Sequence, residues 1–496
     1  MREARAEMGG GHAPPPRGCS ETGTYPPYSR AHCCAPLHAE AWRAWVRPPY
    51  SMTLIVLGLA ACAALWTIGP AEPATLWPAA LLRGYVAAWL CYLLAAIVVT
   101  RARALPRWVL AWIVVAAVVL RVVSLVHAPP MSTDSYRYLW DGRVTNAGIN
   151  PYRHPPDAPE LRHLRDANWR MSFKEIPTLY PPGAEILFAG LARIRATDRA
   201  AFAWAFLGCD LGTILLLIAL LRRTGRAPER VIWYAWSPLA AVETAAGCHV
   251  DTVALFFLVL ALWLIARRGT PTNGSALSYA AAVLCKGPAV FALPCLAVRG
   301  GGRFLAVFLA AGALLTAPFL GAGTRMFTGL GYYMKYWETN SSVFYLLHSL
   351  VELITGVRTR EGFTPVVVEH FAIVRGVTTV ALIAFIVWLI RRRRPGLEWL
   401  LGSVFAVLAA NLLLGAPTLP WYVIWTVPLL CWWPIPGWVV FTLTVFGQYY
   451  ARWLNSAWYP LPLLLGYLPV YALLISDWVR WRLRASSAAV ETPSPG

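Results

Sequence analysis

Charged residues are scarce in this 496-residue chain: only 14% of the residues are Asp, Glu, Lys or Arg, whereas 58% are hydrophobic. Together with a mean hydropathy of +0.53, this shortage excludes an ordinary soluble globular protein. We therefore expect a polytopic membrane protein. Lysine is especially rare, with only Lys174, Lys286 and Lys335 among 43 basic residues.

Several motifs of soluble enzymes are also absent. The sequence has no Walker-type lysine loop, no dinucleotide-binding glycine fingerprint, no HExxH helix and no GxSxG elbow. Any phosphorylated substrate is therefore expected to be a lipid. The ten cysteines are scattered, without the spacing of a disulfide framework or a zinc site. A metal site could in principle be formed by four residues of the Pro/Gly/Arg-rich N-terminal tail, but disorder is the preferred interpretation there; the four are His32, Cys33, Cys34 and His38.

The net charge of +19 would suggest nucleic-acid binding in a soluble protein, but here the arginines cluster at the ends of apolar spans. Cytoplasmic loops of membrane proteins carry such an excess of basic residues, so no nucleic-acid partner is predicted. The clusters assigned to the cytoplasm are Arg101/Arg103/Arg107, Arg222/Arg223/Arg226/Arg230, Arg267/Arg268, Arg299/Arg303, Arg391 to Arg394 and Arg480/Arg482/Arg484. The loops between them then face outward, provided that the short apolar piece 184–194 lies in the membrane interface and does not cross.

Apolar runs long enough to cross about 30 Å of hydrocarbon, about 20 residues each, lie near 50–69, 80–100, 107–127, 200–221, 303–320, 367–390, 397–416 and 459–478. Shorter runs interrupted by Pro or Gly, as where the backbone lines a cavity, lie near 230–247, 250–266, 275–285, 288–298, 420–434 and 436–450. We predict an all-α bundle of about twelve to fourteen spans. It occupies residues 49–484, between a disordered cytoplasmic tail at 1–48 and a disordered tail at 485–496.

The outward loop 128–182, which follows the third long span, is polar, aromatic and Pro-rich. Asp134 is its first acidic residue and lies close to the bilayer surface, where apolar surroundings are expected to raise its basicity. Tyr136, Tyr138 and Trp140 alternate with other residues, and Asp141 follows Asp134 by seven positions, which predicts an amphipathic helix lying on the membrane. The alternative is that Asp134 merely caps this helix.

Two other features of the same loop have structural interpretations. In Asp141-Gly142-Arg143, an Asp and an Arg on either side of a Gly suit a turn held by a local ion pair, although a role in substrate binding stays open. Tyr180-Pro181-Pro182 ends the loop and redirects the chain toward the membrane.

Ionisable residues at membrane depth are costly unless they serve a site or a pathway. His249 and Asp251 are placed at such a turn, where a helix-turn network and an active-site role are both open. Lys286 lies between the short apolar runs 275–285 and 288–298. Its compact cation could bind a phosphate there, or the side chain could instead extend to the membrane interface. Trp337, Glu338 and Asn340 form a further outward polar and aromatic cluster.

At these residues the chain resembles the GT-C glycosyltransferases, multi-pass enzymes that take a sugar from a polyprenyl-phosphate carrier. Within them it is most similar to bacterial glycosyltransferase family 87 and to the mannosyltransferases of the glycosylphosphatidylinositol pathway. The resembling pieces are Asp134 to Tyr152, Thr178 to Pro182, the His249 and Asp251 turn, Lys286 with Pro288, Tyr336 to Asn340, and Pro420 to Tyr422.

The resemblance implies a GT-C-like catalytic domain at 49–484 that performs an inverting transfer of a hexose, with mannose favoured and glucose and arabinose open. Asp134 matches the acidic residue that deprotonates the acceptor hydroxyl, and Lys286 or Arg137 would stabilise the charge on the donor phosphate. Substrate contacts are expected from Tyr136, Asp141, Arg143, Tyr180, His249, Asp251, Trp337, Glu338 and Asn340. Asp134 lacks the adjacent acidic partner found in some members, so no metal is predicted, and no cofactor either.

The implied partners are a polyprenyl-phosphate-linked sugar donor, a lipid or glycan acceptor, and the membrane itself. The site would face outward from the plasma membrane. A transporter or flippase of lipid-linked saccharide is the alternative from a different class, because broken helices and a lysine at membrane depth would serve it equally. The length and aromatic content of the outward loop favour the enzyme.

Overall fold

The computed structural model of the protein describes residues 49–69, 77–357, 360–361, 364–365, 368–449 and 460–490. The N-terminal tail, including the four possible metal-binding residues of the sequence analysis, lies outside the described residues, as do residues 491–496. The last helix, α20, continues to Val490, and the domain boundaries of the sequence analysis stay predictions.

The described part is built almost entirely from helices, which confirms the all-α class. A single two-residue antiparallel pair, β1 (Arg360–Glu361) and β2 (Thr364–Pro365), is the only sheet in the described ranges. The helices are α2 (Pro49–Trp66), α3 (Trp77–Arg101), α4 (Trp108–His127), α5 (Asp134–Asn146), η2 (Pro159–Leu164), α6 (Pro182–Ile194), α7 (Ala200–Arg223), η3 (Pro228–Val231), α8 (Ile232–Ala235), α9 (Pro238–Ala245), α10 (Asp251–Arg268), α11 (Asn273–Cys285), η4 (Gly287–Ala292), α12 (Leu293–Thr316), η5 (Ala317–Phe327), α13 (Thr328–Tyr336), α14 (Val343–Thr355), α15 (Val368–Arg391), α16 (Leu397–Leu414), α17 (Pro420–Val423), η6 (Val427–Cys431), α18 (Pro436–Thr444) and α20 (Pro460–Val490).

Seven helical segments of the described residues are long and apolar enough to cross a membrane, which establishes a multi-pass membrane protein. They lie at 79–101, 108–127, 200–223, 287–336, 369–391, 397–414 and 463–480. The segment 287–336 is not straight, because Gly301 and Gly323 interrupt it with left-handed backbone angles. Two shorter apolar helices, 50–66 and 343–355, accompany them.

The Pro-interrupted runs form short helical pieces. The run 230–247 becomes η3, α8 and α9, and the run 420–434 becomes α17 and η6. Pro238 and Pro420 each occupy the first turn of a helix, where the missing N–H costs nothing because it would have no intrahelical partner. These breaks place polar turn residues inside the bundle.

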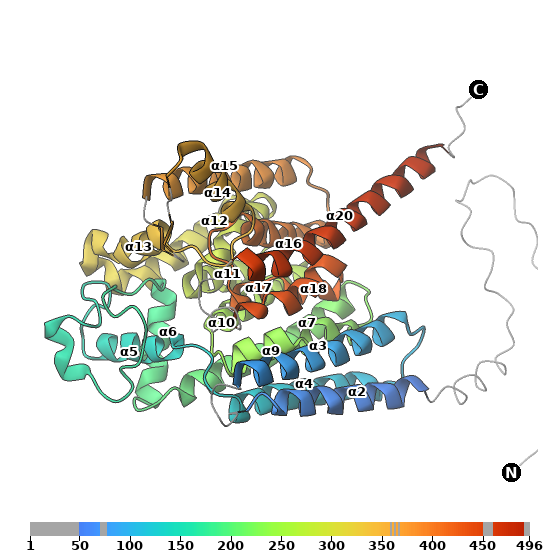
Figure 1. The fold of residues 1–496 in the computed structure, drawn as a ribbon, viewed down its shortest axis with the longest axis horizontal. Helices are drawn as coiled ribbons and strands as arrows, with labels where there is room; N and C mark the ends of the chain where they lie inside the picture. Colours follow the sequence, from blue (N-terminus) through green and yellow to red (C-terminus); the bar gives the residue numbers. More distant parts are fainter. Residues whose placement is uncertain are drawn as a thin grey trace, which may run out of the picture. The chain divides into compact units, whose positions relative to one another are not determined.

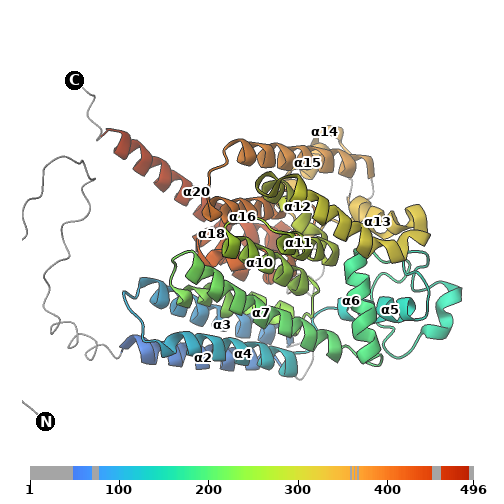
Figure 2. The ribbon, with the colours of Figure 1, turned by 180° about the vertical axis from the view of Figure 1, so that it is seen from behind.

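The loop 128–182 begins with α5, which packs closely against α6 at one end of the bundle, near α13 and opposite α20 (Figures 1 and 2). Gly142 permits this packing, since a Cβ there would lie 2.3 Å from the carbonyl oxygen of Phe188. The prediction of an amphipathic helix is wrong, because none of the residues of α5 is exposed, whereas its position at the membrane surface stays a prediction. Eight of its thirteen residues are buried, because α6 and the rest of the loop cover it on several sides.

A buried ion pair connects three helices in the apolar interior. Arg121 on α4 donates through Nε to Asp210 on α7 and through Nη1 to the carbonyl of Ala235 at 2.6 Å. The hydroxyl of Tyr234 donates to the other carboxylate oxygen of Asp210. Arg121 and Asp210 are both fully buried, so each charge depends on the other for compensation.

We expect Asp210→Ala to destabilise the bundle strongly, by about 3–5 kcal/mol, because it leaves the guanidinium of Arg121 buried without a counterion. Thermal unfolding of the purified protein in lipid nanodiscs measures the effect. The double substitution Arg121→Leu with Asp210→Leu, which removes both charges, is expected to recover most of the loss. A single variant that unfolds at the wild-type temperature would show that the pair does not hold these helices together.

Candidate active site

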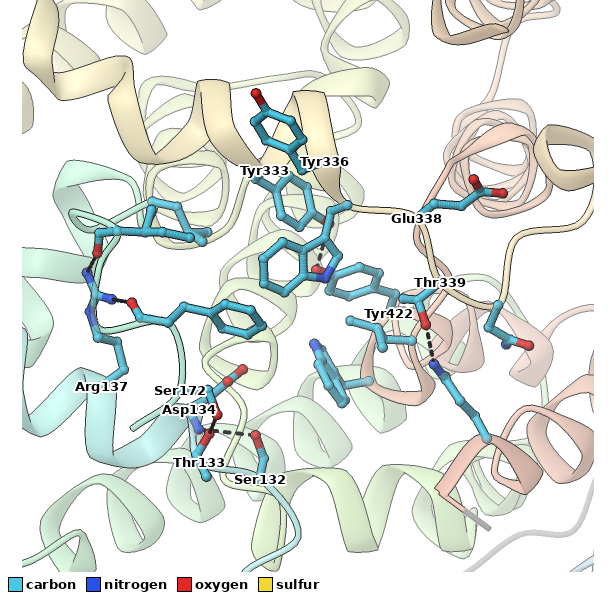
Figure 3. Close-up of a pocket in the computed structure, with 18 of the residues that line it drawn as sticks. Ser132, Thr133, Asp134, Arg137, Ser172, Tyr333, Tyr336, Glu338, Thr339 and Tyr422 are labelled. Carbon is cyan, nitrogen blue, oxygen red and sulfur yellow. Dashed lines mark hydrogen bonds between the residues drawn. The ribbon is translucent and has the colours of Figure 1, made fainter. Parts of the chain in front are cut away.

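A cavity of about 530 Å³ lies where the outward loop meets the C-terminal half of the chain. One wall is made by the start of α5 and by residues 172–180. The opposite wall is made by the end of α13, the segment 337–340 and the residues after α18, and Lys286 and α17 complete the lining. Figure 3 shows Asp134 on one side and Glu338 and Thr339 on the other, with Tyr333 and Tyr422 between them.

Asp134 is the first residue of α5, and its carboxylate is 31% exposed. Its backbone N–H donates to Ser132 Oγ at 3.1 Å, and the N-cap residue Thr133 makes no capping hydrogen bond with its side chain. The carboxylate instead lies 3.6 Å from His249 Nδ1. The helix-cap interpretation therefore does not account for Asp134, whose side chain faces the cavity.

The charged groups around Asp134 oppose the effect of burial on its pKa. Burial by itself would raise the pKa of Asp134, but the close contact with His249 and its charge, together with the charge of Lys286 and a hydrogen bond with Ser132, hold the pKa below its usual value. The prediction that this carboxylate has raised basicity is therefore wrong. Two cations contributed by distant parts of the chain outweigh the apolar surface.

Lys286 occupies the extended junction between α11 and η4. Its ammonium group lies 3.3 Å from Asp251 Oδ2 and above the ring of Tyr180, 5.1 Å from the ring centre. It lines the cavity and is buried, so it does not extend away from the bundle as the interfacial alternative requires. Lys286 thus gives the cavity a positive charge close to Asp134.

His249 and Asp251 do not line the cavity but support the two residues that do. Both are fully buried. Asp251 pairs with Lys286 and accepts a hydrogen bond from Trp425 Nε1 at 2.9 Å. His249 lies behind Asp134 and stacks on Trp421 with ring centres 3.9 Å apart. The two residues therefore form the network that the sequence left open, and their role in an active site stays a prediction.

On the far side of the cavity, the segment 337–342 is tied to residues 416–418. Thr339 pairs with Pro417 in a parallel bridge, and Asn340 Nδ2 donates to the carbonyl of Thr418 at 3.0 Å. Asn340 has a left-handed φ of 49°, a conformation that non-glycine residues adopt at an energetic cost. Glu338 accepts from Ser341 Oγ and lies 2.8 Å from His348 Nδ1. This wall is therefore rigidly held.

Besides His249 and Asp251, three of the expected substrate contacts lie away from the cavity. Tyr136 packs in the small cluster around Trp140. Asp141 pairs with Arg137 at 2.9 Å, and Arg143 pairs with Asp166 at 2.8 Å. The predicted local ion pair between Asp141 and Arg143 is therefore wrong, because both residues lie within a continuous helix and find partners on different sides of it.

Arg137 lines the cavity, but its guanidinium is already engaged. Besides the two bonds to Asp141, it donates to the carbonyl oxygens of Phe173 and Ile176 at 3.3 and 3.0 Å. Phe173 has a left-handed φ of 55° and lies against Trp337, with ring centres 4.2 Å apart. Arg137 thus fixes the loop that carries Phe173, which leaves Lys286 as the better placed phosphate ligand.

The sequence analysis missed several groups of the site. Glu243 is fully buried and lies 3.3 Å from His249 Nε2, and a lone carboxylate in a short apolar run was a usable signal for it. Gln448 and Tyr449 line the cavity, but nothing in their local sequence distinguishes them. In the described part of the chain, no group of three or more His, Cys, Asp or Glu side chains is arranged to hold a metal ion.

A family model described as alpha-(1->6)-mannopyranosyltransferase, N-terminal domain, matches residues 35–300, more than half of the chain. The chain belongs to this family. The range that matches the family includes Asp134, His249 and Lys286 and ends before Glu338. An alpha-(1->6)-mannopyranosyltransferase of Mycobacterium tuberculosis (strain ATCC 25618 / H37Rv) is 23% identical over 390 residues, which cover 64% of this chain and 65% of that relative. The match thus spans slightly less than two thirds of the relative, and no solved structure matches the chain.

We expect His249→Gln to raise the pH at which Asp134 takes up a proton, by about 1–3 pH units. The cation that holds the pKa of Asp134 down is lost in this variant, whereas the burial that raises it remains. Infrared titration of the substrate-free protein in nanodiscs measures the midpoint, and the band that disappears in Asp134→Asn identifies the carboxyl group. The exposed His163→Gln serves as the control. An unchanged midpoint in His249→Gln would remove His249 from the electrostatics of the site.

Proposed function

We propose that this protein is an integral membrane mannosyltransferase that transfers mannose, with inversion, from a polyprenyl-phosphate donor to a hydroxyl of a lipid or glycan acceptor. The single observation that carries the proposal is that the carboxylate of Asp134 and the ammonium group of Lys286 face the same cavity from different elements. Family membership supports mannose as the transferred sugar. The mannosyltransferase of Mycobacterium tuberculosis that the chain resembles supports it as well.

The reaction needs few protein groups, because a polyprenyl phosphate is already a leaving group. The acceptor oxygen forms a bond to C1 of the mannose as the bond from C1 to the phosphate oxygen breaks, and the electron pair of that bond leaves with the phosphate. Asp134 accepts the proton of the acceptor hydroxyl. Lys286 stabilises the negative charge that develops on the phosphate, an interaction that strengthens in the transition state.

The lining of the cavity suits both parts of such a donor. Tyr333 and Tyr422 join their hydroxyls at 2.9 Å, and Tyr336 and Trp337 continue the aromatic surface along α13. Aromatic faces pack against the C–H faces of sugars and against isoprenoid chains, while their polar ends keep hydrogen-bonding capacity. Exposed apolar side chains on α14, including Leu346 and Leu353, offer further contact with lipid.

The outer face of the plasma membrane is proposed from charge distribution. Arginine clusters such as 222–230 and 391–394 lie at helix ends, and the positive-inside rule assigns them to the cytoplasm. The loop 128–182 then belongs to the outer side. A polyprenyl-phosphate sugar presented on that side would reach the cavity without a nucleotide, consistent with the absence of nucleotide-binding motifs.

We expect Asp134→Asn to lower kcat by about 10²- to 10⁴-fold, with donor binding little changed, because the amide preserves shape but cannot accept the proton. Transfer of radiolabelled mannose from a polyprenyl-phosphate donor, in membranes containing the protein, measures the change. Asp198→Asn, which alters an exposed carboxylate paired with Arg195, is the matched control.

Wild-type-like transfer by Asp134→Asn would disprove the catalytic assignment. A protein that moves the labelled lipid across the membrane without transferring its sugar, in both wild-type and variant forms, would instead support a transporter of lipid-linked saccharide.

We expect Lys286→Met to raise the KM for the donor by about 10- to 150-fold, the equivalent of a charged hydrogen bond worth about 1.5–3 kcal/mol. The same substitution leaves Asp251 without its cation, so the double variant Lys286→Met with Asp251→Asn separates donor binding from stability. We expect the double variant to regain thermal stability while keeping the high KM. Recovery of donor affinity in the double variant would show that Lys286 acts only through Asp251.

A further inference from the structure

Asp134 is the first of three ionisable side chains that form a row and come from separate elements. Asp134 Oδ2 lies 3.6 Å from His249 Nδ1, and His249 Nε2 lies 3.3 Å from Glu243 Oε2. His249 and Glu243 are fully buried, whereas Asp134 is partly exposed to the cavity. One imidazole therefore faces two carboxylates, and of these only Asp134 is exposed to the cavity.

The position of the imidazole is closely defined. Its ring stacks on Trp421 with an angle of 13° between the planes. Gly247 lies so close that a Cβ there would be 2.7 Å from His249 Cδ2, and Cys248 has a left-handed φ of 54°. Neither ring nitrogen has a conventional hydrogen-bond partner in the described part of the chain, so the two carboxylates are the groups with which the ring exchanges charge.

Glu243 has a route back to the cavity. Its Oε2 accepts a hydrogen bond of 3.0 Å from the hydroxyl of Tyr449, which lines the cavity wall. Its other oxygen, Oε1, is buried without a hydrogen-bond partner among the described residues. A carboxylate held with an incomplete set of partners is costly in its charged form, and taking up a proton relieves that cost.

The remaining titratable and charged groups around this row come from every neighbouring element. The hydroxyl of Tyr138 on α5 accepts a hydrogen bond of 3.4 Å from the backbone N–H of Val250 in the turn, and Asp251 of α10 is paired with Lys286. Tyr180 and Tyr333 also interact with Asp134. Tyr85 interacts with Glu243, and Arg199 interacts with the adjacent Cys248. Lys286 and Asp251 compensate each other, so the charge on His249 is balanced chiefly by Asp134 and Glu243.

We propose that His249 and Glu243 form an internal proton switch that sets the strength of Asp134 as the catalytic base, an inference that rests on the mannosyltransferase function proposed above. In the resting state the imidazolium lies between two carboxylates and keeps Asp134 charged. When Asp134 accepts the proton of the acceptor hydroxyl, the imidazolium loses one counterion and passes its Nε2 proton to Glu243. All three side chains are then neutral, so no uncompensated charge remains in the buried row. His249 and Glu243 are positioning residues, because they act through Asp134.

Substitution of Glu243 provides the decisive test, because it should shift the titration midpoint of Asp134 in the direction opposite to the shift caused by substitution of His249. Glu243→Gln preserves the shape and the contact with Tyr449 but cannot accept the proton, so the imidazolium remains charged and faces Asp134 alone. We expect the infrared midpoint of Asp134 in the full-length, substrate-free protein to fall by about one pH unit or more. With donor and acceptor present, we expect kcat to fall by at least about tenfold while the KM for the donor stays within about threefold.

Thr252→Val is the matched control, because it removes a buried hydrogen bond between Thr244 and Thr252 on the same two helices without touching the row. We expect it to leave the Asp134 midpoint unchanged. A merely structural role for Glu243 would lower thermal stability without lowering the midpoint, and that result would overturn the proposal, as would a kcat equal to that of the wild type.

The titration needs no substrate and therefore separates the two hypotheses. Opposite midpoint shifts in Glu243→Gln and His249→Gln, in a protein that transfers no mannose from any polyprenyl-phosphate donor, would support the switch and disprove the proposed function. Mannose transfer by the wild type without these shifts would support the function and disprove the switch.

Discussion

The cost of placing a charge away from water governs this structure. The described bundle buries carboxylates and cations that could not be accommodated singly, and two of its ion pairs join residues from different elements. Arg121 with Asp210 does this deep in the bundle, and Lys286 with Asp251 does it at the cavity. Since an unpaired buried charge costs several kcal/mol, these pairs restrict how the helices can be arranged around the cavity.

The ion pairs differ in how much of their surface is exposed. Arg121 and Asp210 have no exposed surface, so their charges serve the fold. Asp134 is the exception, because its carboxylate has one face toward His249 and another toward the cavity. A group that is held charged by buried partners yet remains accessible is suited to accept a proton. The same pairing rule thus accounts both for a closed ion pair inside the bundle and for the carboxylate that we propose as the base.

The long helices are predictable from the sequence because bilayer thickness sets both their length and their apolar character. Asp134 and Lys286 are predictable because a lone ionisable residue near an apolar run is unusual. The sign of the pKa shift of Asp134 is not, since it depends on His249 and Lys286, which lie more than a hundred residues away in the chain. Local spacing suggested a pair between Asp141 and Arg143, whereas Asp141 pairs one helical turn away with Arg137 and Arg143 pairs with Asp166 in the following loop.

The walls of the cavity come from two parts of the chain, one inside and one outside the range that matches the family. The range 35–300, which establishes the family, supplies Asp134 and Lys286. The far wall, with Glu338 and Gln448, comes from outside that range. Because the wall opposite the proposed base would determine which molecule can present a hydroxyl to it, family membership bears more closely on the proposed chemistry than on the acceptor. The acceptor must be sought in the shape and polar groups of the C-terminal wall.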